Sequence, residues 1–185
     1  MRVSRVAPQI VRLMTTGGRG RRRRARAPQM GRAQVMLNGG VEQSERKQKN
    51  MAKTFKQMVS EARQEVQAIS PQEAQQRLQS NPNTLVVDVR EPNDPSHQSL
   101  GDIPGSKDVP LGVLAIRADL EMPESVRDQD LQDRSRPVIT TCQGGGQAAL
   151  AAKTLKDMGF TNVTMIEGGT QGWKDAGLPT EQPAS

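Results

Sequence analysis

Hydrophobic and polar positions are arranged so that strand-like runs alternate with helix-like segments along the chain. Three short runs are almost continuously apolar and rich in β-branched residues: TLVVDV at 84–89, PVITTC at 137–142 and NVTMIE at 162–167. Uninterrupted apolar runs of this length are typical of strands that are buried on both faces of a sheet. The pattern therefore predicts three internal strands.

Helical spacing of apolar positions predicts helices around these strands. The first is an amphipathic N-terminal helix within residues 51–68, whose apolar positions recur every three or four residues. These positions are Phe55, Met58, Val59, Ala62 and Val66. Further helices are predicted over 111–120 and 147–158, and in the short segment that ends at Gly177.

One more helix, ahead of the first strand, has a clear start signal. Ser70 can cap it, Pro71 suits its first position, and Glu73 completes a capping box, so we predict a helix from residue 71 to about residue 79. The alternation of helices with fully apolar strands predicts an α/β fold in which a parallel sheet is covered on both faces. In such folds the functional sites lie beyond the carboxyl ends of the strands.

Charge divides the chain at residue 42. The 185 residues carry a net charge of +6, but residues 1–41 contain ten arginines and no acidic residue. Residues 42–185 hold 16 basic and 20 acidic residues, which gives a net charge of −4. The basic excess belongs to the N-terminal segment and does not indicate that the globular part binds nucleic acid.

Residues 1–50 are expected to form a disordered basic segment, because RGRRRRARA is low in complexity and several glycines interrupt any long element. Two origins for it remain open. An Arg-rich, acid-free start is typical of an organelle-import peptide and would place the protein in the mitochondrial matrix. Alternatively, the true start is Met51, since SERKQKN could be a translated bacterial ribosome-binding site. We favour this second origin, and with it a cytoplasmic location.

The composition excludes several classes of protein. Cys142 is the only cysteine, which excludes an intramolecular disulfide and a Cys-rich metal site. No apolar run approaches the ~20 residues needed to span a bilayer. The only aromatic residues are Phe55, Phe160 and Trp173, so we expect an aliphatic core, with Trp173 packed in it or on its helix.

Cys142 ends a predicted strand, and three glycines and a predicted helix follow it. Backbone N–H groups in such a turn can converge on one point, and the helix N-terminus adds a partial positive charge. Gly144, Gly145 and Gly146 allow backbone torsions that other residues resist. This cradle would stabilise a thiolate, which is the nucleophilic form of cysteine. The alternative is that Cys142 is a small buried hydrophobic residue.

From about residue 69 to residue 179, the chain resembles the single-domain rhodaneses, a family of sulfurtransferases. Four segments carry the resemblance in order: VVDVREP (86–92), GDIPGSKDVP (101–110), VITTCQGGGQAALAAKTLKDMGF (138–160) and NVTMIEGGTQGWKDAGLP (162–179). The resemblance implies a rhodanese domain over residues 69–181. Its fold would be a central parallel five-stranded sheet flanked by helices on both faces.

The resemblance also implies a ping-pong transfer of sulfur. The Cys142 thiolate would take the outer sulfur of thiosulfate, release sulfite, and pass the sulfur to cyanide or another thiophilic acceptor. The loop that would bind the persulfide consists of Gln143, Gly144, Gly145, Gly146, Gln147 and Ala148. No metal or organic cofactor is needed, and we expect a monomer or weak dimer that binds neither nucleic acid nor membrane.

Some positions depart from the family pattern. Gln147 stands where the loop commonly has arginine, so we expect weak binding of thiosulfate. Asp102 stands where the family often has histidine, and we expect its side chain to be peripheral. The only histidine, His97, lies in a Pro/Asn-rich loop and is predicted to be a surface residue. Asp88 and Arg90 close the first strand, either as a structural pair beside the site or with Arg90 attracting anions.

Two other functions follow from the same loop. A cysteine phosphatase needs a longer loop with an arginine at its end, and no arginine follows Arg136, so phosphatase activity is not expected. The stronger alternative is a sulfur carrier or regulatory binding module whose thiosulfate turnover was lost with the change at Gln147.

Overall fold

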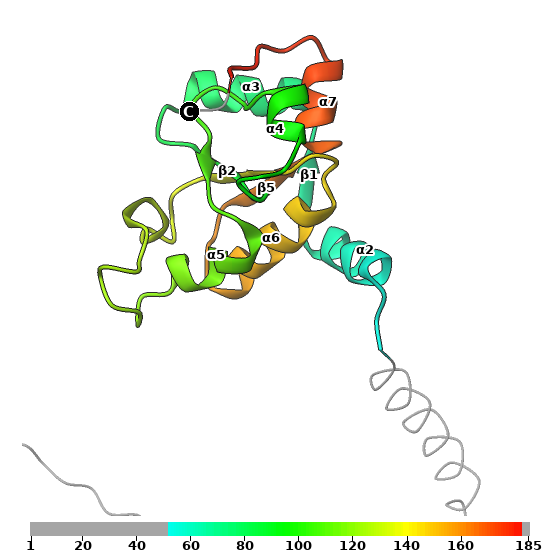
Figure 1. Ribbon diagram of the computed structural model, residues 1–185. Helices are drawn as coiled ribbons and strands as arrows, with labels where there is room; N and C mark the ends of the chain where they lie inside the picture. The colour runs from blue at the N-terminus through cyan, green and yellow to red at the C-terminus, as the bar shows by residue number, and fades with distance from the viewer. Residues whose placement is uncertain (1–51, 183–185) are drawn as a thin grey trace, which may run out of the picture. The chain divides into compact units, whose positions relative to one another are not determined.

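The computed structural model describes residues 52–182, and its central feature is a parallel sheet of five strands (Figure 1). The sheet order is β1-β5-β4-β2-β3, and every neighbouring pair is parallel. The strands are β1 (Gln67–Ile69), β2 (Leu85–Asp88), β3 (Lys107–Asp108), β4 (Val138–Thr141) and β5 (Val163–Ile166). The predicted α/β fold is confirmed. The expectations for residues 1–50 lie outside the described residues.

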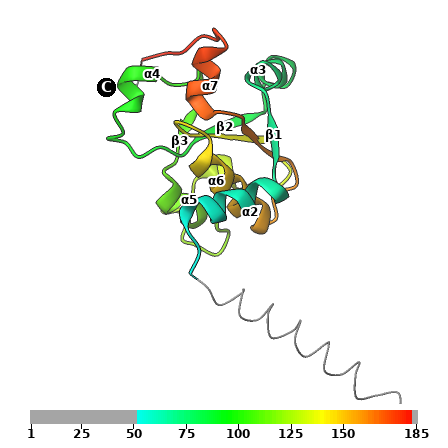
Figure 2. The same ribbon diagram turned by 90° about the vertical axis from the view of Figure 1, so that its right-hand side faces the viewer.

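Helices cover both faces of the sheet, as Figures 1 and 2 show. On one face lie α2 (Phe55–Glu65), α5 (Leu111–Ala118) and α6 (Gly146–Asp157). On the other face lie α3 (Pro71–Ser80) and α7 (Gly169–Asp175), with α4 (Ser96–Leu100) against α7. A short 3-10 helix, η1 (Gln129–Leu131), lies in the polar connection before β4.

Alternate residues of each central strand enter two hydrophobic clusters on opposite faces. In β2, Leu85 and Val87 belong to the cluster under α2, α5 and α6, whereas Val86 belongs to the cluster with Trp173. Because both faces are covered, neither needs polar residues, which explains the continuous apolar runs. Trp173 is buried, and its indole N–H donates to the carbonyl of Pro179 at 2.8 Å. Its predicted place in the core is therefore confirmed.

The inner side of α6 consists largely of alanine. Ala148, Ala149, Ala151 and Ala152 are all fully buried. Side chains this small let the helix lie close to β4 on one side and to α2 on the other, at native packing density. The start of α6 is thereby held directly over the end of β4, where Cys142 lies.

The three predicted strands agree with β2, β4 and β5 to within one residue at each end. The two edge strands were not predicted from the residue pattern, because β1 has three residues and β3 only two. Residues 67 and 68 were assigned to the N-terminal helix, but that helix ends at Glu65 and they belong to β1. A strand this short leaves too little periodicity to distinguish it from the end of a helix.

The start of α3 is confirmed, but part of its predicted cap is wrong. The Ser70 hydroxyl accepts a hydrogen bond from the backbone N–H of Glu73 at 3.1 Å. The Glu73 carboxylate does not return to Ser70; it accepts from Arg77 at 2.7 Å, one turn further along. The ion pair with Arg77 replaces the second half of the capping box. A complete capping box occurs instead at α2, between Thr54 and Gln57.

Among residues 52–182, no helix is both long enough and apolar enough to cross a membrane.

Candidate active site at the Cys142 loop

Cys142 directly follows β4, the central strand of the sheet, and precedes the turn that begins α6. Its side chain points back into this turn. The sulfur accepts hydrogen bonds from the backbone N–H of Gly145 at 3.2 Å and from that of Ala148 at 3.4 Å. Gly145 is the N-cap residue of α6 and provides no side-chain cap, so the sulfur takes the place of the usual capping oxygen.

This position favours negative charge on sulfur. Two N–H donors converge on it, and the first turn of α6 adds the positive end of its helix dipole. The residue is only 3% exposed. The neighbouring loop residues Gln143 and Gly144 are exposed, whereas Gly146 and Gln147 are half-buried. The thiol is therefore held at the bottom of a loop whose outer residues face solvent.

The three loop glycines differ in why a larger residue would be unfavourable. The expectation that all three supply unusual torsions was wrong. Only Gly145 has a positive φ, at 84°. A Cβ at Gly146 would lie 3.2 Å from the Phe55 ring, so this glycine admits a side chain from α2. A Cβ at Gly144 would meet nothing within 4 Å. Backbone conformation favours glycine at position 145, and tight packing against Phe55 favours it at position 146.

The first turn of α7 clamps the outside of the loop. The N–H of Thr170 donates to the carbonyl of Cys142 at 2.8 Å, and the N–H of Gln171 donates to that of Gln143 at 3.0 Å. These contacts need a very close approach, because a Cβ on Gly169 would lie 2.1 Å from the Cys142 oxygen. The clamp therefore fixes the two residues that lead into the turn whose Gly145 and Ala148 N–H groups contact the sulfur.

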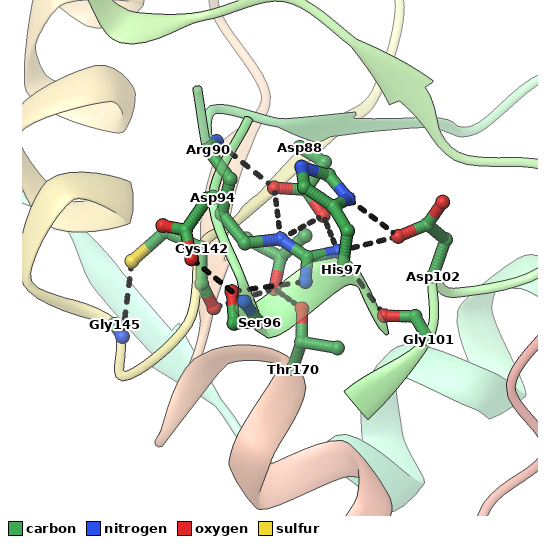
Figure 3. Close-up of polar contacts among 11 residues, drawn as sticks. Asp88, Arg90, Asp94, Ser96, His97, Gly101, Asp102, Cys142, Gly145 and Thr170 are labelled. Atoms are coloured by element: carbon green, nitrogen blue, oxygen red, sulfur yellow. Dashed lines mark hydrogen bonds and ion pairs between the residues drawn. The ribbon is translucent and has the colours of Figure 1, made fainter. Parts of the chain in front are cut away.

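A buried charged cluster lies beside the loop, at the carboxyl end of β2 (Figure 3). Its centre is the guanidinium of Arg90, which is fully buried. Arg90 donates to both carboxylate oxygens of Asp88, at 2.6 to 3.0 Å, and to Asp102 at 2.7 Å. It also donates to the Ser96 hydroxyl at 3.3 Å and the Gly101 carbonyl at 3.2 Å. Burial by itself lowers the pKa of Arg90, but hydrogen bonds and charges of the two carboxylates raise it on balance.

The cluster is joined to the loop through the sheet. Asp88 is paired with Thr141 in the register of β2 and β4, and the N–H of Val89 donates to the Thr141 carbonyl at 3.0 Å. The Thr141 hydroxyl in turn contacts that of Thr170 at 3.1 Å. Because its donors are directed to internal partners, Arg90 is placed to support the loop rather than to face an incoming anion.

The expectations for His97 and Asp102 were wrong, since both side chains belong to the buried cluster. His97 is 6% exposed and Asp102 is 7% exposed. The Nδ1 atom of His97 lies 2.8 Å from a carboxylate oxygen of Asp102. The turn chemistry of the segment suggested a surface loop, but residues 96–100 form α4 and carry His97 inward. An imidazole is thus present beside position 102, supplied from five residues earlier.

The geometry of this cluster does not favour a metal ion. Asp88, His97 and Asp102 offer ligand atoms within 4.8 Å of one another. However, the carboxylate oxygens involved already accept hydrogen bonds from Arg90, whose positive charge occupies the place a cation would take. The expectation of no metal stays a prediction.

Comparison with known proteins decides the family. Residues 70–176 match the family model of the rhodanese-like domain. The chain belongs to the rhodanese family. A thiosulfate sulfurtransferase named GlpE, from Ectopseudomonas mendocina, is 34% identical over 120 residues, which cover 63% of this chain and 92% of that relative.

Two solved structures extend the likeness. A polysulfide-sulfur transferase homodimer from Wolinella succinogenes shares 28% identity and a TM-score of 0.54, over 70% of this chain and 88% of its own. A protein of unknown function from Rhodopseudomonas palustris, described as a possible tyrosine phosphatase, shares 32% identity and a TM-score of 0.64, over 71% and 97%. Together with the family match, the relatives support a sulfurtransferase that acts on a sulfur donor and an acceptor.

Several residues of the site were not found by sequence reasoning. Ser96, His97 and Asp102 gave no signal because their segment reads as a series of turns, and only the fold brings them to Arg90. Gly169 did carry a signal, since two consecutive glycines directly follow a buried strand. A glycine pair at that place can indicate a close backbone approach.

The clamp on the loop predicts different effects for two glycines. Gly169 and Gly177 both have positive φ, at 61° and 71°, but a Cβ at Gly177 would meet nothing within 4 Å. We expect Gly177→Ala to lower the free energy of unfolding by about 1–2 kcal/mol through backbone strain alone. Gly169→Ala should lower the free energy of unfolding by a further ~1–3 kcal/mol, because the added methyl group overpacks the clamp. It should also lower sulfurtransferase activity. Urea unfolding measures both variants, and equal losses would contradict the clamp.

The buried cluster predicts energetic coupling between positions 97 and 102. His97→Asp and Asp102→His each remove the contact between imidazole and carboxylate. Each should lower the free energy of unfolding by about 3 kcal/mol, because a buried polar group is left without its hydrogen-bond partner. The double variant exchanges the two groups and should recover about 1–3 kcal/mol relative to the sum of the single losses. Strictly additive losses in urea unfolding would show that the two side chains act independently.

Proposed function

We propose that the protein transfers sulfane sulfur through a persulfide on Cys142, from a donor such as thiosulfate to a thiophilic acceptor such as cyanide. The observation that carries the proposal is the placement of the chain's only thiol. It lies at the end of the central strand, with two backbone N–H groups directed at its sulfur. Membership of a family with sulfurtransferases among its relatives supports the same chemistry.

The reaction needs only the thiolate and the two substrates. The thiolate attacks the outer sulfur of thiosulfate, a new S–S bond forms on Cys142, and the old S–S bond breaks with its electron pair leaving on sulfite. Cyanide carbon then attacks the outer persulfide sulfur, so that thiocyanate leaves and the thiolate is restored. The N–H groups of Gly145 and Ala148 stabilise the negative charge at the start and end of the cycle.

The alternative is a sulfur carrier or regulatory binding module without thiosulfate turnover. The observation that favours it is Gln147, a neutral amide in the first turn of α6, where family members commonly have arginine. An amide holds a sulfonate less well than a guanidinium, which can donate two charge-assisted hydrogen bonds. A carrier would accept sulfur on Cys142 from another donor and release it only to a partner.

Mass spectrometry of the intact full-length protein tests the covalent step. After treatment with thiosulfate, we expect the mass to rise by about 32 Da, one sulfur atom, and cyanide should remove the addition. The matched control is Cys142→Ala, which should gain nothing.

The outcomes separate the two functions. Loading by thiosulfate and discharge by cyanide support the enzyme. Loading only by a low-molecular-weight persulfide, with no thiosulfate:cyanide turnover, supports the carrier. An addition that persists in Cys142→Ala would overturn the role of the thiol. Hydrolysis of p-nitrophenyl phosphate is not expected, since residues 143–148 contain no arginine.

The composition of the loop predicts a gain for one substitution. Gln147→Arg should lower the KM for thiosulfate about tenfold with little change in kcat, because it adds charge-assisted hydrogen bonds to the sulfonate. Gln79→Arg adds the same charge at an exposed position near the C-terminal end of α3 and should leave KM unchanged. Steady-state kinetics of both variants measures the effect, and an equal response would mean that overall charge, not the loop, is responsible.

A further inference from the structure

One stripe of α2 lies against the glycine loop. Phe55, Val59 and Arg63 are spaced four residues apart and therefore share one face of the helix. A Cβ at Gly146 would lie 3.2 Å from the Phe55 ring and 3.8 Å from Val59. Figure 2 shows α2 lying over α6, the helix that begins in this loop. The stripe therefore reaches the site from outside the loop itself.

Arg63 is the last member of this stripe and brings a positive charge to the loop. Its terminal nitrogen Nη2 lies 3.4 Å from the position of a Cβ at Gly145. The N–H of Gly145 is itself 3.2 Å from the Cys142 sulfur. With ordinary bond lengths, these separations put the guanidinium within roughly 9 Å of the sulfur. The side chain is exposed and can adjust its position.

The charge of Arg63 is not used elsewhere in the part of the chain that the structure describes. Within residues 52–182 its guanidinium makes no ion pair or hydrogen bond, and the acidic residues nearest to it along α2 face other partners. Glu61 pairs with Lys53 at 2.6 Å, and Glu65 pairs with Lys153 at 3.0 Å. The guanidinium of Arg63, on an exposed side chain beside the loop, therefore has donors available for a ligand.

A pocket of about 370 Å³ lies along the same stripe. Its lining residues are Phe55, Lys56, Val59, Ser60 and Arg63. Two cations, a hydroxyl group and an apolar floor suit a small organic or inorganic anion. Among residues 52–182, no acidic side chain lines the pocket to compete for the cations.

We propose that Arg63 binds the oxyanion group of the sulfur donor, a sulfonate in thiosulfate or a carboxylate in a low-molecular-weight persulfide. The inference rests on the proposed function. Arg63 supplies from α2 the cation that Gln147 does not supply from the loop. It lies before residue 70, where the match to the family model begins, so this determinant of donor specificity belongs to the chain's own N-terminal helix.

Kinetics of the full-length protein tests the role of Arg63. Arg63→Gln should raise the KM for the donor about tenfold and leave kcat within twofold, because the lost contact acts on binding. The KM of Arg63→Lys should lie between that of the wild type and that of Arg63→Gln. The matched control is Arg117→Gln, which removes one exposed charge from the last turn of α5 and should leave KM within twofold. Thermal unfolding of each variant shows whether packing of α2 has changed.

Two further arms identify the anion and the origin of the effect. Thiosulfate and cysteine persulfide are compared as donors, and the one whose KM responds to Arg63→Gln carries the group that Arg63 binds. Adding Gln147→Arg to Arg63→Gln should bring the KM for thiosulfate back to about the wild-type value, since the cation returns from the other side of the loop. Raising the salt concentration should raise KM more in the wild type than in Arg63→Gln.

Binding measured without turnover separates the inference from the proposed function. Calorimetry of thiosulfate with Cys142→Ala should show affinity about tenfold higher than with the double variant that also carries Arg63→Gln. If no sulfur is ever transferred but this difference persists, the proposed function fails and Arg63 remains an anion-binding residue. If Arg63→Gln behaves like Arg117→Gln in both kinetics and binding, the inference is overturned.

Discussion

The site depends on how two backbone segments approach each other at the end of β4. The N–H groups at the start of α7 bind the carbonyls of Cys142 and Gln143, and this is sterically open only because residue 169 is glycine. These contacts hold the backbone of Cys142 and Gln143 in place, directly before the turn whose Gly145 and Ala148 N–H groups contact the sulfur. The position of the loop over the end of β4 therefore depends on the clamp.

The buried charged cluster also helps to hold the Cys142 loop in place, from the other side of the sheet. Arg90 ties the end of β2 to α4 and to the segment at Asp102, so three parts of the chain are fixed by one side chain. A buried guanidinium needs all of its partners, because an uncompensated charge away from water is costly. Asp102 serves two partners in this cluster, because the same carboxylate oxygen accepts from Arg90 and lies 2.8 Å from the imidazole of His97.

Much of the fold was accessible from sequence because the internal strands and long helices repeat a clear pattern. Val86, Ile139 and Ile166 lie in strands without a polar face. Such strands are typical of a parallel sheet that is covered on both faces. The edge strands could be predicted only through the family resemblance, because two or three residues are too few to show a strand-like alternation of apolar and polar positions. Cys142 and its loop were predictable because strand end, glycines and helix start are consecutive. Arg63 meets a loop that is about 80 residues further along the chain, and Asp102 meets Arg90 twelve residues before it, so no local pattern encodes these contacts. His97 meets Asp102 only because residues 96–100 form α4 in a segment that reads as turns.

Placing the donor-binding cation on α2 instead of in the loop has a physical consequence. An arginine within the first turn of α6 is fixed by the same backbone that forms the cradle, so its reach is short and suits a small sulfonate. An arginine on a separate helix stands further from the sulfur and retains more freedom, which suits a longer donor whose anionic group lies several bonds from the sulfane sulfur. Because Gly145 and Gly146 leave room for the side chains of α2, the loop is shaped for this arrangement. With Gln147 in the loop and Arg63 on α2, the proposed site has room for an organic persulfide that is longer than thiosulfate.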